Sequence, residues 1–241
     1  MLRRLLLGIT DLVYPKKCLA CKDVLAPAES SKHVCAGCFS KIKFNIPPFC
    51  HSCGRHLEDF KTHKNLCPQC LRLTFNFDRA FSPCVYDGVV KELIHEFKYK
   101  GKVRLAKPLG ALMADFIREY SLPMEYMDHI LPMPLSKTRL REREFNQAHH
   151  LSTHLSGVFE KDMLDNVLTR TRHTRSQTEL EMPERRKNIL GSFKVTDRGA
   201  VKNKNILLID DVLTTGATSS EAAGVLKEAG ANIVFVLTLA N

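Results

Sequence analysis

Residues Ile206–Thr218 read ILLIDDVLTTGAT, and this stretch decides the fold. Four apolar residues in a row are typical of a short strand that is buried on both faces, as in a parallel sheet. The run ends on Asp210 and Asp211, and a loop of threonines around Gly216 follows. Because open α/β sheets bind ligands beyond the carboxyl ends of their strands, this stretch predicts a ligand site as well as a fold.

The chain after residue 80 has the pattern of an α/β fold. A helix at about 219–229 and an apolar strand at 233–239 follow the quoted stretch, and strand, helix, strand normally means two parallel neighbours in one sheet. Apolar residues recur at helical spacing within 89–101, about 105–120 and 145–155, and a short apolar strand begins at 129. We therefore expect a parallel sheet flanked by helices.

The residues around this strand end indicate the chemistry of the ligand. Free N–H groups and the positive dipole end at the start of a helix attract anions, and Gly216 allows a phosphate to approach the backbone closely. Carboxylates repel a phosphate, so Asp210 and Asp211 suit hydroxyl groups or a bound Mg²⁺. A ribose 5-phosphate combines both requirements. We expect its phosphate on the loop formed by Thr214, Thr215, Gly216, Ala217 and Thr218.

Eight of the nine cysteines form four C-x-x-C pairs in the first 70 residues. Successive pairs are separated by 13, 11 and 13 residues. Each pair supplies two thiolates from one turn, so four pairs can hold two Zn²⁺ ions, which would be structural because no coordination position stays open. The spacing fits a double zinc ribbon but leaves cross-braced pairing open. The predicted ligands are Cys18, Cys21, Cys35 and Cys38, then Cys50, Cys53, Cys67 and Cys70.

Two other uses of these cysteines fit less well. Disulfides need an oxidising compartment, and we find no secretory signal. A redox protein usually carries a single C-x-x-C near a βαβ unit. The ninth cysteine, Cys84, lies in an apolar setting and is expected to be a small buried residue. The cysteines therefore mark an N-terminal module, with predicted domains at 1–75 and 80–241.

Charge and hydropathy suggest where the protein acts. The first 80 residues hold 13 Lys and Arg against 6 Asp and Glu, whereas the other 161 hold 23 against 20. This basic excess is compatible with a nucleic-acid partner. Residues 2–13 have helical apolar spacing, and no segment reaches the roughly 20 apolar residues of a membrane span. We expect a cytoplasmic protein whose N-terminal helix packs on the protein or contacts the inner face of the membrane.

The quoted stretch resembles the 13-residue phosphoribosyl-pyrophosphate (PRPP) motif of type I phosphoribosyltransferases over its whole length. The resemblance implies a type I phosphoribosyltransferase-like sheet, with Asp210 and Asp211 on the ribose hydroxyls, Thr214–Thr218 on the 5-phosphate, and Mg²⁺ bound with PRPP. A generic phosphate loop would not explain the paired aspartates.

The order of motifs along nearly the whole chain resembles the competence protein ComF family, which includes GntX-like proteins. These motifs are the cysteine-rich module, YDGVVKELIHEFKYKG, LPMPLSKTRLREREFNQAHHLS, TRTRHTRSQTELEMPERRKNILGSF and the PRPP motif. The chain departs from the family at Glu144, where the family has glycine. The resemblance implies a pyrophosphate loop at Pro134, Leu135, Ser136 and Lys137, and a basic hood formed by Arg139, Arg143, Asn146, Gln147, Gln177, Arg185 and Lys98.

Two functions follow from these observations. The first is a phosphoribosyltransferase that transfers the pentosyl group of PRPP to an acceptor that the sequence does not identify. The second is a non-catalytic PRPP sensor that binds single-stranded DNA through its zinc ribbons and basic surface. The family resemblance links either one to DNA uptake in natural transformation or to DNA utilisation, with competence and DNA-processing proteins as partners. Fold alone does not decide between them.

Overall fold

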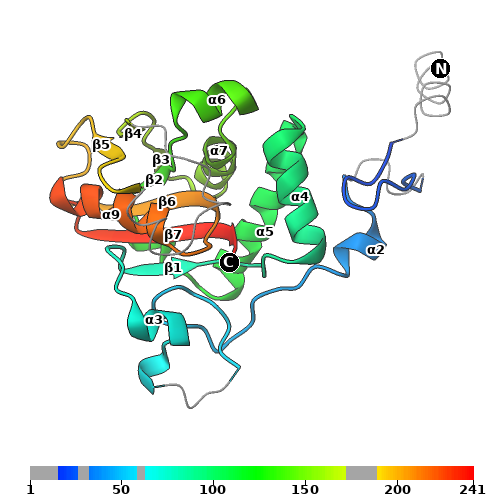
Figure 1. The fold of residues 1–241 in the computed structure, drawn as a ribbon, viewed down its shortest axis with the longest axis horizontal. Helices are drawn as coiled ribbons and strands as arrows, with labels where there is room; N and C mark the ends of the chain where they lie inside the picture. Colours follow the sequence, from blue (N-terminus) through cyan, green and yellow to red (C-terminus); the bar gives the residue numbers. More distant parts are fainter. Residues whose placement is uncertain (1–15, 27–32, 59–62, 172–188) are drawn as a thin grey trace.

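A five-stranded parallel sheet forms the centre of the protein in the computed structural model, which describes residues 16–26, 33–58, 63–171 and 189–241 (Figure 1). The expected N-terminal helix and the predicted hood residues Gln177 and Arg185 lie outside these ranges. The strand order is β1-β7-β6-β2-β3, and each adjacent pair is parallel. The strands are β1 (Arg79–Phe81), β2 (His129–Pro132), β3 (Asp162–Met163), β6 (Asn205–Val212) and β7 (Ile233–Ala240).

Helices cover both faces of this sheet. Alternate residues of β6 point to opposite sides, so this strand contributes side chains to a core on each face. Ile206 and Leu208 pack in one core with residues of α9, whereas Leu207 and Ile209 pack in a second core with residues of α4, α5 and α7. All four side chains are buried, as expected for a strand in the middle of a parallel sheet. The four helices are α4 (Gly88–Tyr99), α5 (Ala106–Glu119), α7 (Gln147–Phe159) and α9 (Ala217–Glu228).

The predicted parallel sheet flanked by helices is thus confirmed, and the differences concern short elements. Strand β6 continues to Val212, so both aspartates lie within the strand instead of after it. The edge strands β1 and β3 have three and two residues, too few for a periodic pattern to reveal them. The other elements not expected from the sequence are the antiparallel hairpin of β4 (Leu168–Arg170) and β5 (Phe193–Val195), helix α6 (Lys137–Arg143), and the 3₁₀ turns η3 (Val103–Leu105) and η4 (Met124–Tyr126).

The eight N-terminal cysteines form two clusters of four thiols, paired in sequence order and not cross-braced. The two Sγ atoms of Cys21 and Cys35 are 3.9 Å apart, and those of Cys53 and Cys67 are 3.7 Å apart. Sulfurs about 2.3 Å from a tetrahedral Zn²⁺ lie about 3.8 Å from one another, so both clusters fit the metal. The short elements here are α2 (Ala36–Phe39), η2 (His63–Asn65) and α3 (Pro68–Arg72).

The two clusters differ in how they are attached to the sheet. The second cluster (Cys50, Cys53, Cys67, Cys70) packs into the same core as Phe77 and α9. The first cluster (Cys18, Cys21, Cys35, Cys38) belongs to a small separate core, and its segment extends away from the sheet in Figure 1. Lys22 in its first turn reaches Glu96 of α4 at 2.7 Å. The division at residues 75–80 stays a prediction, since the second cluster shares a core with the sheet.

Two further expectations concern Cys84 and membrane spans. Cys84 is completely buried, as expected, and this burial raises the pKa of its thiol to about 12. In the described part of the chain, every helix is too short or too polar to cross a membrane.

The different attachment of the clusters predicts different effects of losing each metal. Cys50→Ser should lower the melting temperature of the whole protein, because the second cluster is part of the main core. Cys18→Ser should remove one Zn²⁺ but leave the main transition almost unchanged. Metal content and thermal unfolding by circular dichroism would test this, with two Zn²⁺ per chain expected in the wild type. Equal losses of melting temperature in both variants would contradict it.

Candidate functional site

A cavity of about 430 Å³ opens where β2 and β6 end. It brings together most of the residues that the sequence predicts for the site, from three separate segments. Lys137, Asn146 and Gln147 do not line it. The predicted residues that do are Lys98, Pro134, Leu135, Ser136, Arg139, Arg143, Asp210, Asp211, Thr214, Thr215, Gly216, Ala217 and Thr218.

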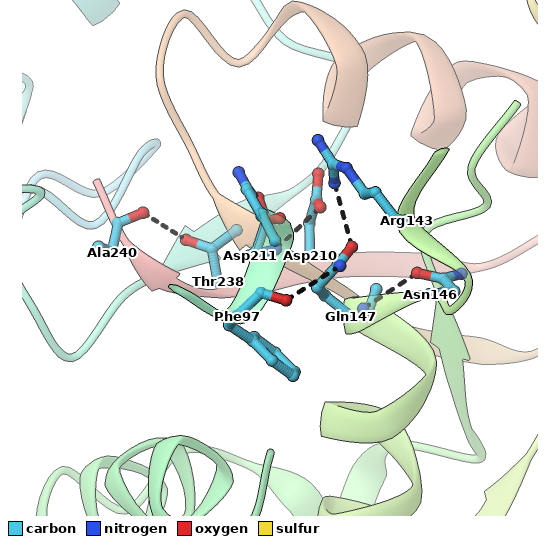
Figure 2. Close-up of polar contacts among 10 residues, drawn as sticks. Phe97, Arg143, Asn146, Gln147, Asp210, Asp211, Thr238 and Ala240 are labelled. Atoms are coloured by element: carbon cyan, nitrogen blue, oxygen red, sulfur yellow. Dashed lines mark hydrogen bonds and ion pairs between the residues drawn. The ribbon is translucent and has the colours of Figure 1, made fainter. Parts of the chain in front are cut away.

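Asp210 and Asp211 lie side by side at the end of β6, as Figure 2 shows, and contact each other. The backbone N–H of Asp211 donates to Oδ1 of Asp210 at 2.8 Å. Lys98 Nζ, in the last turn of α4, lies 2.8 Å from Oδ1 of Asp211. Burial, together with the neighbouring charge of Asp211, raises the pKa of Asp210 to about 7. The strand therefore ends on Asp211, whose carboxylate is paired with Lys98, and on Asp210, whose carboxyl group gains or loses its proton near neutral pH.

The loop after β6 leads into helix α9, and its residues Thr214–Thr218 line the cavity. Gly216 is the N-cap of α9 and has a φ of +74°, which a residue with a side chain adopts only at a cost. A Cβ at this position would also lie 2.6 Å from Cε1 of Phe75. Asn76 fixes the same region, since its side-chain amide donates to the carbonyl of Ser220 at 3.0 Å. No sequence pattern predicts this support by Phe75 and Asn76, which lie about 140 residues away in the chain.

Two predicted residues, Asn146 and Gln147, support the cavity from behind instead of lining it (Figure 2). Asn146 donates to the carbonyl of Met133 at 3.0 Å and so fixes the start of the loop that runs to Ser136. Gln147 is buried, accepts a hydrogen bond from Arg143 at 3.0 Å and donates to the carbonyl of Phe97 at 3.4 Å. These contacts orient Arg143 toward the cavity.

Positive charge gathers on the side of the cavity that faces the two aspartates. Arg139, Arg143 and Arg170 all line it. Burial lowers the pKa of Arg170, and the charge of Asp210 opposes this shift. The guanidinium of Arg143 lies 5.2 Å from the centre of the Tyr99 ring. Tyr99 and His95 line the cavity from one face of α4, a role that its amphipathic pattern did not reveal.

Glu144 occupies the C-cap of α6 with a φ of +66°, in the left-handed region. Glycine adopts this conformation freely, which explains why a glycine suits the position. The glutamate keeps the turn, because its N–H still donates to the carbonyl of Leu140 at 2.8 Å. The substitution therefore introduces backbone strain without changing the local fold.

The raised pKa of Asp210 predicts a pH-dependent effect of Asp210→Asn on stability. Between pH 4 and 7 the unfolded chain loses this proton before the folded chain does, so the wild type loses stability as pH rises. The asparagine variant lacks this loss. Its stability relative to the wild type should therefore increase by about 2 kcal/mol from pH 5 to pH 8, measured by urea denaturation.

Asp128→Asn provides a control of opposite sign. The backbone N–H of Asn205, with Lys204, lowers the pKa of Asp128, so its charged form stabilises the fold above pH 4. This variant should be less stable than the wild type at both pH 5 and pH 8. A stability difference for Asp210→Asn that stays constant between these pH values would contradict the assignment.

Glu144→Gly should stabilise the protein by about 0.5–1 kcal/mol, because glycine relieves the positive φ at the end of α6. Arg141→Gly, in the interior of the same helix, should destabilise it by a similar amount. Denaturant midpoints of the two variants would test this. A loss of stability in Glu144→Gly would show that the glutamate side chain makes a compensating interaction.

A family model matches the N-terminal module of this chain, and related proteins match nearly its whole length. The family model of the double zinc ribbon domain matches residues 9–71. Competence protein F of Haemophilus influenzae is 29% identical over 227 residues, covering 93% of this chain and 96% of that protein. DNA utilization protein YhgH of Escherichia coli K12 is 28% identical over 231 residues, covering 95% of this chain and 98% of that protein.

Among solved structures, this chain aligns with parts of two phosphoribosyl-pyrophosphate-related enzymes. Glutamine phosphoribosylpyrophosphate amidotransferase of Bacillus subtilis is 19% identical, with a TM-score of 0.37 over 55% of this chain and 25% of that one. Adenine phosphoribosyltransferase of Leishmania donovani is 15% identical, with a TM-score of 0.33 over 55% of this chain and 64% of that one.

The relationship to competence proteins is decided by sequence. Competence protein ComFC of Bacillus subtilis is 30% identical over 204 residues, which are 82% of this chain and 79% of that protein. Together with the double zinc ribbon and the motif order, this match shows that the chain belongs to the competence protein ComF family.

Proposed function

We propose that the cavity binds PRPP, or a related phosphoribosyl ligand, together with Mg²⁺. The observation that carries this proposal is the meeting of three kinds of group around one space of about 430 Å³. These are two adjacent carboxylates, the N-terminus of a twelve-residue helix, and a group of arginines. PRPP has ribose hydroxyls for the carboxylates, a 5-phosphate for the helix N-terminus and a pyrophosphate for the arginines.

The two aspartates take the ribose hydroxyls in this proposal. Carboxylate oxygens accept hydrogen bonds, and the two hydroxyls of a ribose can donate to neighbouring carboxylates. Asp211 is already fixed by Lys98 at 2.8 Å, which leaves its second oxygen for the ligand. Asp210 has a raised pKa, and a nearby Mg²⁺ favours its charged form. Binding of the metal complex should therefore strengthen between pH 6 and pH 8.

The loop from Thr214 to Thr218 takes the 5-phosphate. The start of α9 carries the positive end of the helix dipole, and Gly216 allows close approach of the ligand. Thr215 is already used locally, because its Oγ1 accepts a hydrogen bond from the N–H of Ala217 at 3.4 Å. Phe75 packs on the outer side of the loop and limits its movement.

The pyrophosphate lies against the opposite wall. Pro134–Lys137 leads into α6, where Ser136 Oγ accepts a hydrogen bond from the N–H of Arg139. Arg139, Arg143 and Arg170 face the same space and neutralise negative charge. The predicted hood residues Gln177 and Arg185 lie outside the described residues, and their part in closing the site stays a prediction.

The reaction favoured by this arrangement is transfer of the pentosyl group. A nitrogen of the acceptor forms a bond to C1 of the ribose as the bond from C1 to the pyrophosphate oxygen breaks. Pyrophosphate leaves with the electron pair, and the acceptor nitrogen loses its proton to water. The chain's contribution is positioning and stabilisation of the leaving charge by the arginines. The alternative is binding without turnover, as a PRPP sensor that acts on single-stranded DNA.

The relatives favour a role in DNA handling for either version. One is named competence protein F, and another is named DNA utilization protein YhgH. The basic excess in the first 80 residues places positive charge on the module with the cysteine clusters. A phosphoribosyl site and a DNA-binding module on one chain would link nucleotide metabolism to the handling of incoming DNA. We propose that link as the biological context.

The double substitution Asp210→Asn and Asp211→Asn should weaken binding of PRPP with Mg²⁺ by at least tenfold, because both acceptors for the ribose hydroxyls become poorer and the metal loses its charge partner. Isothermal titration calorimetry with the full chain would measure this. Asp115→Asn with Asp165→Asn removes the same charge outside the cavity and should leave the affinity within twofold. Unchanged affinity in the first variant would refute the proposed ribose site.

Release of pyrophosphate separates the enzyme from the sensor. The full chain would be incubated with PRPP, Mg²⁺ and a panel of nucleobases, and pyrophosphate would be measured over time. The enzyme version predicts release that depends on one base and is lost in Asp210→Asn with Asp211→Asn. Tight PRPP binding without release for any base, alongside salt-sensitive binding of single-stranded DNA, would favour the sensor.

A further inference from the structure

A second cavity, of about 360 Å³, lies at the edge strand β1. Its walls come from the segment that joins the two cysteine clusters, from β1, from the end of α5 and its following turn, and from β7. This volume falls within the range of small-molecule sites in proteins. The lining residues are Pro47, Phe49, Arg79, Phe81, Phe116, Tyr120, Ser121, Leu122, Pro123 and Phe235.

Five of these ten lining residues are aromatic. Phe49 meets Phe116 and Tyr120 edge to face, with ring centres 5.8 and 5.0 Å apart. Phe81 and Phe235 meet in the same way at 5.5 Å. Phe49, Tyr120 and Phe235 are only partly buried, so parts of their rings remain open to a ligand. Such walls are suited to a flat ring, which aromatic side chains bind by stacking or edge contacts.

Arg79 is the only charged residue in this lining, and it lacks a hydrogen-bonded partner for one buried donor. Its Nε is fully buried and makes no hydrogen bond to any of the described residues. The guanidinium lies 5.0 Å from the centre of the Phe81 ring. Burial lowers the pKa of Arg79, and the charge of Cys50 in the second cysteine cluster opposes this shift. The guanidinium has further N–H donors besides Nε, and Arg79 lines the cavity, so these donors can meet an anion there.

A buried residue outside the lining, Asn45, fixes one wall of the cavity. Asn45, which precedes Pro47 closely in the chain, is buried, and its amide donates to the carbonyls of Ser82 and Cys84 at 3.0 and 3.2 Å. The segment that carries Phe49 is therefore fixed to the chain just after β1. This makes the cavity part of the folded structure.

This cavity is separate from the proposed phosphoribosyl site, and the two share no lining residue. Arg79 pairs with Phe235 in the sheet, whereas Asp210 pairs with Thr238, three residues further along β7. Three residues of a strand span about 10 Å. The second cavity thus lies toward the amino ends of the strands, and the first lies at their carboxyl ends.

The geometry points to a second ligand site at β1, which takes a planar aromatic anion of mononucleotide size, with the ring between the aromatic walls and the phosphate on Arg79. No lining residue is acidic, so a ligand with an amino group, such as a free amino acid, would lack a partner for that charge. Guanidinium groups bind phosphate oxygens through two parallel hydrogen bonds. The source of the nucleotide is either a free mononucleotide or an unpaired base within a single strand of DNA.

The fluorescent nucleotide 2-aminopurine deoxyriboside 5′-monophosphate would test this site, because aromatic stacking quenches its emission. The full chain contains no tryptophan, so the signal has little background. We expect saturable quenching with the wild type, and binding at least tenfold weaker for Arg79→Gln and for the nucleoside without phosphate. Arg118→Gln, near the end of the same helix as Tyr120 but outside the lining, should bind within twofold of the wild type.

Two further measurements separate this site from the phosphoribosyl site and identify the source. Arg79→Gln should bind PRPP as the wild type does, and excess PRPP should not reverse the quenching. An oligonucleotide with one internal 2-aminopurine should be quenched in an Arg79-dependent way if the ligand is a base within a strand, and only the mononucleotide should respond if it is free. Equal binding by Arg79→Gln and wild type, or loss of quenching on addition of PRPP, would overturn the proposal.

Discussion

Two like charges at consecutive positions of a buried strand are the constraint on which the site depends. The fold places Asp210 and Asp211, both partly buried, side by side at the end of β6, and their proximity raises the free energy of the doubly charged form. Lys98 offsets this for Asp211, and the raised pKa of Asp210 shows that the compensation is incomplete. The protein therefore retains an electrostatic cost that hydroxyl donors or a cation can relieve, as is common at functional sites.

The surroundings of this carboxylate pair are organised in shells. Arg139, Arg143 and Arg170 contribute positive charge directly to the cavity. Asn146 and Gln147 act one layer behind, through hydrogen bonds to the carbonyl of Met133 and to Arg143. The arginines thus supply charge to the cavity, and the residues behind them fix its geometry. Rigid binding sites require both.

The sequence predicted the centre of this structure well and its margins poorly, for physical reasons. Runs of consecutive apolar residues predicted β6 and β7, and the turn between them predicted the start of α9. The C-x-x-C spacing predicted both metal clusters. Strands β1 and β3 are too short to show a period, and they form only because β7 and β2 offer an edge. The family resemblance placed Lys98 in the basic hood, and its contact with Asp211 emerged only from the packing of α4.

The sequence also did not predict which residues from distant parts of the chain contact the loop or line the second cavity. Phe75 touches the loop at Gly216, and Arg79 lines an aromatic cavity, but neither residue belongs to a recognisable motif. Glu144 is a different case, since its departure from the family's glycine was visible in the sequence, whereas the left-handed turn at this position came from the structure.

The packing of Phe75 on Gly216 has a consequence for how metal and ligand affect each other. Phe75 lies five residues after Cys70, so a short segment of chain joins the second cysteine cluster to the loop at α9. If Zn²⁺ in this cluster tightens the loop, thermodynamic reciprocity requires a ligand on the loop to tighten the hold on Zn²⁺ by the same factor. Occupancy of this metal cluster and occupancy of the proposed phosphoribosyl site would then be coupled thermodynamically.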